Sequence, residues 1–414
     1  MLYEITLLIY NLSLIPVIFF SVLFIILALV NLGMDDRPRS WKKMKELPFV
    51  SIQVPTFNDP IAERCVRKCL NMDYPKDKFE IIIADDSTNI QTQEILRRYS
   101  EEFPGKVKYI HRDNREGFKP GALKNAMKIT DGEIIVVFDA DWIPRKDFLR
   151  KIVRPFSDPG VAIVQSRQGF SNAHSNIITR FAAYILTVYH VIVMPINNKV
   201  NSVFFCGTAG AIRREAFDEV GGWNMKSITE DADLSLKLLL KGYRTEYLSF
   251  ETPSEVPDTF EGFIKQQMRW CYGNARVFFD NASKILFDPN LTLGQRMMIL
   301  YITLGNLVAP FVVIMTIFGL SGWFLGEPAL FDLWDFVDLV SRFLFTAGFI
   351  LLGVVTLVKL GRMNEFKDFL VSALAMGIVL AFANSIAFTR AVFNKGLHSN
   401  WYCTPKVDNQ KALK

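Results

Sequence analysis

A long uncharged and apolar stretch of this 414-residue chain lies close to its beginning. Leu7–Val30 contains no Asp, Glu, Lys or Arg. As an α-helix rising about 1.5 Å per residue, it is long enough to cross a hydrocarbon layer of roughly 30 Å. A retained anchor is favoured over a secretory signal peptide for two reasons. No basic residue precedes the stretch, since Glu4 is the only charged side chain there, and the apolar run is too long for a signal peptide. The sequence therefore predicts a transmembrane helix within residues 1–33.

Basic residues follow this first helix and orient it. They are Arg37, Arg39, Lys42, Lys43 and Lys45. Cytoplasmic loops carry an excess of Lys and Arg, so the end of the helix and the segment after it are expected in the cytoplasm.

A second apolar region, residues 291–390, lies near the other end of the chain. Met297–Leu320 and Leu339–Val358 are predicted to span the membrane, with an acidic loop between them. Phe369–Phe388 either crosses or lies along the interface. The basic tail, residues 391–414, favours the interfacial position, since a crossing would place those charges outside.

The overall composition fits a soluble part joined to a few membrane segments. Mean hydropathy is +0.20 and 21% of the residues are charged. The net charge of +5 is too small and dispersed to indicate nucleic-acid binding. Four His and five Cys, irregularly spaced, do not indicate a zinc site or a disulfide framework.

Residues 41–290 form one block of domain size, in which strand-like and helix-like segments alternate. The predicted strands are Phe49–Val54, Phe79–Ala84, Val107–Ile110 and Glu133–Phe138, and the predicted helices are Ala62–Met72, Gln93–Tyr99 and Gly121–Lys128. This alternation with continuous apolar strands predicts a parallel sheet covered on both faces. Within the block, 174–196 is apolar but interrupted by polar residues and Pro195. It is either a buried core helix or an amphipathic helix at the membrane surface.

Acidic residues follow two of the predicted strands, where ligands bind in such sheets. Asp85 and Asp86 follow the second strand, and Asp139 and Asp141 follow the fourth. An extended backbone would point Asp139 and Asp141 the same way. Two close carboxylates repel one another unless a cation or proton lies between them, and hard oxygen ligands suit Mg²⁺ or Mn²⁺. On its own, the pair fits a solvated turn equally well.

Two further motifs lie on predicted helices. Thr229 can cap a helix predicted over Asp231–Lys241, which places Glu230 and Asp231 at its positive end, either as capping groups or as functional acids. Further along, Gln266, Arg269 and Trp270 fall on one helical face. An amide, a guanidinium and an indole on one face suit a diphosphate and a sugar ring better than a core.

In this order and spacing, the motifs resemble those of the membrane-integrated, inverting family 2 glycosyltransferases, which include cellulose, chitin and hyaluronan synthases. The wording Gly207-Thr208-Ala209-Gly210 and Gly221-Gly222-Trp223 is similar to the mannan and glucan synthase-like branch of the cellulose synthase-like proteins. The resemblance implies an α/β glycosyltransferase A fold, with a Rossmann-like mixed sheet between N- and C-terminal transmembrane helices. It also implies a multi-pass protein of the plasma membrane whose catalytic domain is cytoplasmic.

The resemblance further implies roles for single residues. The nucleotide would be held by Pro55, Thr56, Asn58, Asp86, Lys119, Asp139, Gln266 and Arg269. The acceptor would be held by Cys206, Gly207, Thr208, Glu230 and Trp270. Asp139 and Asp141 would hold Mg²⁺ or Mn²⁺, Asp141 more directly, and Asp231 would be the general base.

The implied activity is that of a hexosyltransferase that moves a sugar from a UDP- or GDP-sugar to a growing β-linked polysaccharide. The tail His398–Lys406 resembles the Thr-x-Lys gating-loop segment of polymer synthases. An alternative is a single addition to a lipid acceptor, as in ceramide glucosyltransferases, and a third interpretation is a non-catalytic membrane scaffold. Three or four spans are few for a sugar channel, so partner chains or a homo-oligomer would complete an export path. The expected partners are thus the nucleotide sugar, a polysaccharide or lipid acceptor, and membrane lipids.

Overall fold

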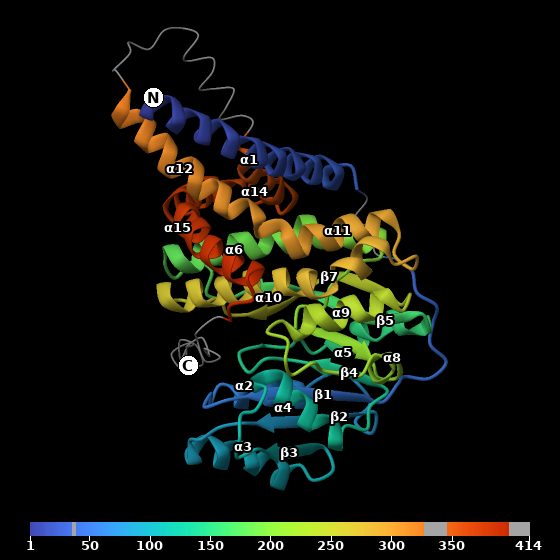
Figure 1. Cartoon of the computed structure of the whole chain (residues 1–414). Helices are drawn as coiled ribbons and strands as arrows, with labels where there is room; N and C mark the ends of the chain where they lie inside the picture. Colours follow the sequence, from blue (N-terminus) through green and yellow to red (C-terminus); the bar gives the residue numbers. More distant parts are fainter. Residues whose placement is uncertain (35–38, 327–345, 397–414) are drawn as a thin grey trace.

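The computed structural model describes residues 1–34, 39–326 and 346–396, in which a sheet-containing part carries a group of apolar helices at one end (Figure 1). The strands are β1 (Val50–Thr56), β2 (Phe79–Asp85), β3 (Val107–His111), β4 (Ile134–Val137), β5 (Val161–Phe170), β6 (Gly210–Arg213) and β7 (Arg244–Ser254). The helices that accompany the sheet are α2 (Ala62–Leu70), α3 (Ile90–Glu102), α4 (Phe118–Ala126), α5 (Phe148–Ile152), α8 (Arg214–Glu219), α9 (Glu230–Leu240) and α10 (Phe260–Phe287).

One sheet of the described residues contains all seven strands, in the order β3-β2-β1-β4-β6-β5-β7. Neighbouring strands run parallel except where β6 pairs antiparallel with β4 and β5. The four predicted strands are confirmed as one parallel group. The other three strands were not predicted individually, and β6 makes the sheet mixed, as the glycosyltransferase A fold implied.

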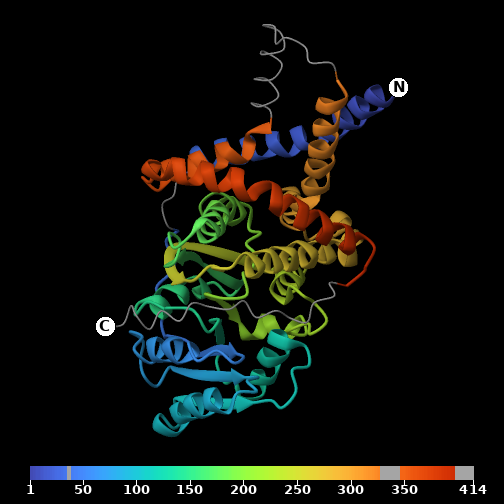
Figure 2. The ribbon, with the colours of Figure 1, turned by 90° about the vertical axis from the view of Figure 1, so that its left-hand side faces the viewer.

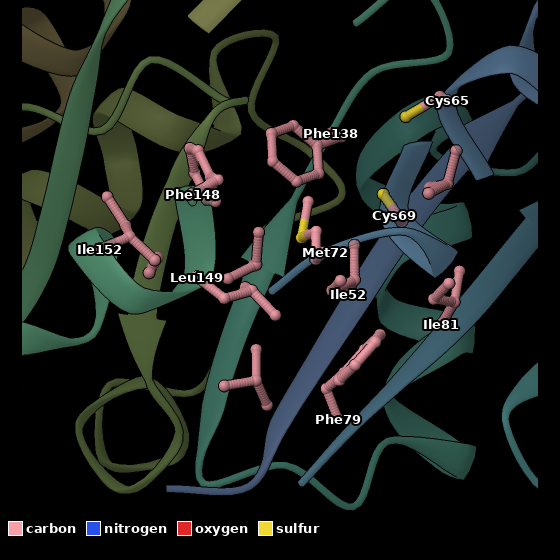
Figure 3. Close-up of a cluster of buried hydrophobic side chains, with 14 of the residues drawn as sticks. Ile52, Cys65, Cys69, Met72, Phe79, Ile81, Phe138, Phe148, Leu149 and Ile152 are labelled. Carbon is pink, nitrogen blue, oxygen red and sulfur yellow. The ribbon is translucent and has the colours of Figure 1, made fainter. Parts of the chain in front are cut away.

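Strands β1, β2 and β4 are buried along their whole length and mostly apolar, because both of their faces are covered. Ile52 of β1 and Ile81 of β2 are fully buried in a cluster with α2, whose Cys65 and Cys69 point into the same core (Figure 3). Ile82, next along β2, is buried on the opposite face beside α4. Alternate residues of a strand point to opposite faces, so helices on both sides require continuous apolar runs.

The register of the parallel strands places their carboxyl ends side by side. Thr56 at the end of β1 pairs with Asp85 at the end of β2, and Gln53 pairs with Val137 at the end of β4. Asp86 and Asp139, which follow these ends, therefore lie at one edge of the sheet, where parallel α/β sheets bind ligands.

The predicted helices exist, with shifted ends. The helix predicted over Gln93–Tyr99 is α3, which begins at Ile90, because the side chain of Asn89 accepts a hydrogen bond from Thr92 N and caps the first turn. The helix predicted over Asp231–Lys241 is α9, which begins one residue earlier.

Apolar helices occupy the end of the molecule opposite β3 (Figures 1 and 2). They are α1 (Leu2–Leu32), α11 (Leu293–Leu304), α12 (Val308–Leu325), α14 (Gly348–Lys359) and α15 (Phe366–Val392). Four helical segments of the described residues are long and apolar enough to cross a membrane: Leu2–Leu32, Ile177–Val200, Leu293–Leu325 and Met363–Val392. Large apolar side chains such as Phe19 and Phe324 are exposed on α1 and α12, as contact with lipid requires. The interfacial position of Phe369–Phe388 stays a prediction.

The segment predicted to be interrupted at Pro195 is one continuous helical path. α6 (Ile177–Val188) passes through a π-helical turn, Tyr189–Val193, into α7 (Met194–Val200). Pro195 has no N–H to donate within this helix, and Val191 O, four residues before it, instead accepts from Asn31 Nδ2 at 3.2 Å. About two thirds of this segment, 67%, is buried inside the protein.

Two predictions fall outside the described residues. The first part of the predicted span Leu339–Val358 lies there, and only α14 represents it. The gating-loop-like tail, His398–Lys406, lies there entirely.

Candidate active site

A cavity of about 240 Å³ opens at the carboxyl edge of the parallel strands. One side, called the sheet wall here, consists of residues at or after the ends of β1, β2 and β4 and at the start of α4: Pro55, Thr56, Phe57, Asp59, Asp86, Lys119, Asp139 and Asp141. The opposite side, the helix wall, consists of residues at the start of α9 and on α10: Thr229, Glu230, Asp231, Gln266, Arg269 and Trp270. Cys206 and Thr208 also line the cavity.

Asp139 and Asp141 lie on a tight turn and not on the extended backbone that their spacing predicts. Trp142 N donates to Asp139 O at 3.1 Å, so the chain reverses immediately after β4. Both side chains nevertheless line the cavity. Asp139 N donates to Thr208 Oγ1 at 3.0 Å, and Glu255 N approaches Asp141 Oδ2 at 3.4 Å. The two carboxylates therefore reach one cavity, as predicted, but a tight turn brings them there instead of an extended backbone.

Lys119 connects the two walls. Its ammonium lies 2.6 Å from Asp139 Oδ1 and 4.0 Å from Glu230 Oε1, and it donates to Gly207 O at 3.0 Å. Burial by itself would lower the pKa of Lys119, but the charges of Asp139 and Glu230 outweigh it and raise the pKa. Lys119 is therefore a fixed cation between the acids of the two walls.

The acids at the start of α9 are buried. Burial, followed by the charge of Asp231, raises the pKa of Glu230 to about 7. Burial also raises the pKa of Asp231, against the opposing effect of Lys119 and of the hydrogen bond from Ala232 N to Asp231 Oδ1 at 2.9 Å. A carboxylate with a raised pKa is a better proton acceptor than an exposed one, provided that it stays ionised.

Gly207 permits the close approach of Asp231. A Cβ atom at Gly207 would lie 3.0 Å from Asp231 Oδ2 and 3.4 Å from Lys119 Nζ, and the residue has φ +75°. A side chain would therefore be strained and would press against both charged groups. The Cys206-Gly207-Thr208 segment thus supports the acids through its backbone and through the Thr208 hydroxyl.

Thr229 occupies the N-cap position of α9, as expected, but its side chain does not cap the helix. Its Oγ1 is buried with no hydrogen-bond partner among the described residues. The reason is the tight contact with α10: a Cβ atom at Gly273 would lie 2.3 Å from Thr229 Cγ2. Gly273, which sequence reasoning missed, allows α10 to pack directly onto the start of α9.

The face of α10 predicted from the sequence lies toward the cavity. Gln266, Arg269 and Trp270 all line it. Gln266 Oε1 is buried and has no hydrogen-bond donor among the described residues. Such a group costs free energy unless a ligand or water supplies the donor.

The residues expected at the nucleotide differ in their placement. Pro55, Thr56 and Asp86 line the cavity. Asn58 has its side chain on the β2–α3 connection, where its Oδ1 accepts from Thr88 N and Asn89 N, both at 2.9 Å. Asn58 does not line the cavity, and in this position its side chain supports the loop after β2.

Two arginines after β3 were not singled out from the sequence: Arg115 lines the cavity, and Arg112 supports the sheet wall from behind Asp86. Arg112 binds both carboxylate oxygens of Asp86, with Nε 2.7 Å from Oδ1. Arg115 stacks on Phe57, with its guanidinium carbon 3.3 Å from the ring centre. Their place after a predicted parallel strand was the available signal, since it puts them at the same edge as Asp86.

The chemistry of the two aspartates suits a divalent cation. No group of three or more His, Cys, Asp or Glu among the described residues is arranged to hold a metal. Asp139 and Asp141 offer two carboxylates on one turn, and Mg²⁺ is commonly held by one or two carboxylates together with waters and substrate phosphates. The ammonium of Lys119 beside Asp139 shows that this carboxylate is oriented to receive a cation.

Comparison with known proteins identifies the class of the molecule. Residues 134–384 match the family model described as "Glycosyl transferase family group 2". This match covers more than half of the chain, so the protein belongs to glycosyl transferase family group 2, and the predicted family is confirmed.

The chain is similar to plant enzymes within this family. It is 33% identical over 264 residues to glucomannan 4-beta-mannosyltransferase 9 of Arabidopsis thaliana, covering 61% of this chain and 50% of the relative. It is 34% identical over 265 residues to glucomannan 4-beta-mannosyltransferase 1 of Oryza sativa subsp. japonica, covering 61% and 51%. The chain therefore spans about half the length of these curated relatives.

A solved structure supports the fold. The mannosyltransferase PcManGT from Pyrobaculum calidifontis, determined in complex with GDP-Man and Mn²⁺, superimposes with a TM-score of 0.67 at 18% identity, covering 94% of this chain and 99% of that one. The glycosyltransferase A fold implied by the sequence is confirmed. The predicted hexosyltransferase class is supported by the family match and by the plant relatives.

Proposed function

We propose that the protein is an inverting mannosyltransferase that transfers mannose from GDP-mannose to the end of a growing β-linked polysaccharide at a membrane. The observation that carries this proposal is the convergence of Asp139, Asp141, Lys119, Asp231 and Arg269 on one cavity. The mannosyltransferase relatives and the GDP-Man named with the structural neighbour favour this donor over a UDP-sugar.

The sheet wall would hold the nucleotide. Asp86, fixed by Arg112, accepts hydrogen bonds from the ribose or the base, and Pro55 and Thr56 pack against them. Lys119 and Arg269 approach the diphosphate from the two walls, and Gln266 lies beside Arg269 on the same helical face. Guanidinium groups match phosphate oxygens in a bidentate manner, while the lysine acts as a point charge.

Asp139 and Asp141 would hold a divalent cation, for which the Mn²⁺ named with the structural neighbour favours Mn²⁺ over Mg²⁺. Bound there, the ion would neutralise charge on the departing diphosphate.

Asp231 would act as the general base. Its carboxylate removes the proton from the acceptor hydroxyl while that oxygen attacks the anomeric carbon, and the bond between this carbon and the diphosphate oxygen breaks. The leaving nucleoside diphosphate keeps the electron pair. Attack from the face opposite the leaving group inverts the configuration. The position of Asp231 on the helix wall, opposite the residues after β1 and β2, supports this division of labour.

The acceptor would lie along the helix wall. Trp270 offers a flat apolar surface for a sugar ring, and Gln266 Oε1 is an unmet acceptor for hydroxyl groups. Glu230, with a pKa of about 7, can donate to or accept from a sugar hydroxyl near neutral pH. Cys206, Gly207 and Thr208 form the side of the cavity next to these acids.

The membrane placement is also part of the proposal. Residues 41–290 would form the cytoplasmic catalytic domain, with one anchor before it and residues 291–390 embedded behind it, in the plasma membrane. The long apolar helices at one end of the molecule support this arrangement. A homo-oligomer would supply an export path that so few spans do not enclose.

One experiment tests donor and product together. The full chain, purified in detergent, is incubated with GDP-mannose, GDP-glucose or UDP-glucose, Mn²⁺ and a short β-linked mannan primer, and the products are sized by mass. A ladder of mannose additions with GDP-mannose is expected. A single discrete glycolipid would favour the alternative of a single transfer, and no turnover with any donor would contradict the proposal.

A further inference from the structure

A second cavity lies where the sheet part meets the apolar helices, and it shares only Gln168 with the lining of the cavity described above. It has a volume of about 90 Å³ and is bounded by the end of β5, by β7, by α6 and by the connection between α14 and α15. Three arginines line it, Arg167, Arg180 and Arg362, together with His174, Tyr184 and Glu251. Arg362 directly precedes the apolar segment Met363–Val392, so the cavity lies at the end of a candidate membrane helix.

The positive charge in this cavity is only partly neutralised. Arg362 is satisfied, because Glu365 accepts from its Nε and from its Nη2, each at 2.7 Å, and also accepts from Tyr184 Oη at 3.0 Å. Arg180 donates from Nη1 to Asp368 at 3.2 Å, but its Nε is buried and has no partner among the described residues. Its guanidinium is therefore satisfied on one side.

Arg167 is the least compensated of the three. Its side chain is only 19% exposed, and among the described residues it makes no hydrogen bond. Its ion-pair partner Glu251 keeps its Oε2 3.9 Å from Nε, which is beyond hydrogen-bond distance. A guanidinium carries five N–H donors, and none of the Arg167 nitrogens is among the buried side-chain atoms without a partner, so these donors reach accessible space where an anion can meet them.

Glu251 is held in a position that does not complete this pair. A Cβ atom at Gly169 would lie 2.2 Å from Glu251 Oε1, so the glutamate side chain lies directly over that glycine. Only Oε2 of Glu251 faces Arg167, at 3.9 Å from its Nε, and the glutamate side chain is 52% exposed. The carboxylate is thus available to move aside, while Arg167 on the strand is fixed.

We propose that this cavity binds a phosphate group. A phosphate presents several anionic oxygens to which Arg167 and Arg180 donate together, and the volume corresponds to about three water molecules. Basic pockets beside membrane helices are suited to lipid head groups, and the same chemistry serves a soluble phosphate. Binding there would join α6 and the α14–α15 connection to the sheet.

The test uses the full chain and two probes: inorganic phosphate in detergent solution, and nanodiscs of phosphatidylcholine with or without phosphatidic acid. The thermal unfolding midpoint is measured for the wild type, for Arg167→Gln and for the matched control Arg98→Gln, whose residue is exposed on α3. A probe that binds should raise the midpoint of the wild type and of Arg98→Gln by about 2–4 °C and leave Arg167→Gln unchanged.

A second variant removes the space and keeps the charges. Ala173→Leu places a larger side chain in the cavity wall and should abolish the same response, while GDP-mannose binding reports that the fold is intact. A response to phosphatidic acid alone assigns the site to a lipid head group, and a response to both probes assigns it to any accessible phosphate. Equal responses in all four proteins, or none in the wild type, would overturn the proposal.

Discussion

The two walls of the large cavity differ in how far their polar groups are satisfied. On the sheet wall, Asp86 is bound by Arg112 and Asp139 by Lys119. On the helix wall, Thr229 Oγ1 and Gln266 Oε1 are buried with no partner among the described residues, and Glu230 has a pKa raised to about 7.

This difference indicates two modes of recognition. A wall whose charges are already paired is pre-organised, so a ligand meets a fixed set of groups and little ordering energy is lost. A wall with buried polar groups that lack partners is stabilised most when a ligand supplies the missing hydrogen bonds. We therefore expect the sheet wall, together with Arg269, to act in binding the donor, and the acids at the start of α9 and Trp270 to act mainly when an acceptor is present.

Asp231→Asn tests the largest expected effect. The amide keeps the size of the side chain but cannot accept the acceptor's proton, so the transfer rate should fall by about 10²- to 10⁴-fold. Donor affinity, measured by calorimetry with Mn²⁺ present, should change less than threefold by our estimate. Asp113→Asn, at an exposed site, is the matched control. Substantial transfer by Asp231→Asn would remove the residue from the role of base.

Asp141→Asn probes the opposite wall. Losing one carboxylate at the proposed cation site should weaken Mn²⁺-dependent binding of GDP-mannose by about 10- to 100-fold. The measurement is a titration with Mn²⁺ and again with a chelator. If the variant and the wild type bind equally tightly in Mn²⁺, Asp141 does not hold the ion.

Gly273→Ala alters the helix wall without changing any charge. Its Cβ atom would lie 2.3 Å from Thr229 Cγ2, so α10 and the start of α9 must move apart. A displacement of about 1 Å near reacting groups costs up to roughly 10²-fold, and we expect a loss of about tenfold in kcat with a smaller loss of donor affinity, since Arg269 on α10 also approaches the diphosphate. Gly377→Ala, in α15 with nothing within 4 Å of the added atom, is the control. A larger loss of donor affinity than of kcat would contradict the division between the walls.

The comparison also shows where sequence reasoning stops. β1, β2 and β4 were predictable because strands buried on both faces are mostly apolar runs. β6 is only four residues long, and β7 mixes charged and apolar residues at the edge of the sheet, so neither has such a pattern. The acids of the cavity could be singled out because they directly follow strands or precede a helix.

Other residues of the site have no local signal, because their roles depend on packing between distant segments. Gly273 matters only because α9 approaches α10 at that point. The side chain of Gln165 was equally hidden: its Oε1 accepts from Cys206 N at 2.9 Å across the sheet. The turn at Asp139 was mispredicted as extended, since nothing in Asp-Ala-Asp distinguishes the two conformations.

Glu230→Gln is expected to have the smallest effect, a shift in thermal stability. It tests whether the buried acid of the helix wall lacks a partner that would keep it charged. Glu230 has a pKa near 4.5 when unfolded and about 7 when folded, so the folded protein binds the proton more tightly. This contribution to stability is complete below pH 4.5 and is lost as the pH rises through 7. Glutamine mimics the protonated form at every pH, so the variant loses no stability from this group as the pH rises. The unfolding midpoint of the variant relative to the wild type should therefore rise by about 2–4 °C between pH 4.5 and pH 8.

Glu101→Gln, exposed on α3, should show no such change. A difference that stays constant with pH would mean that the acid is already neutralised by its neighbours, and that both walls are equally paired.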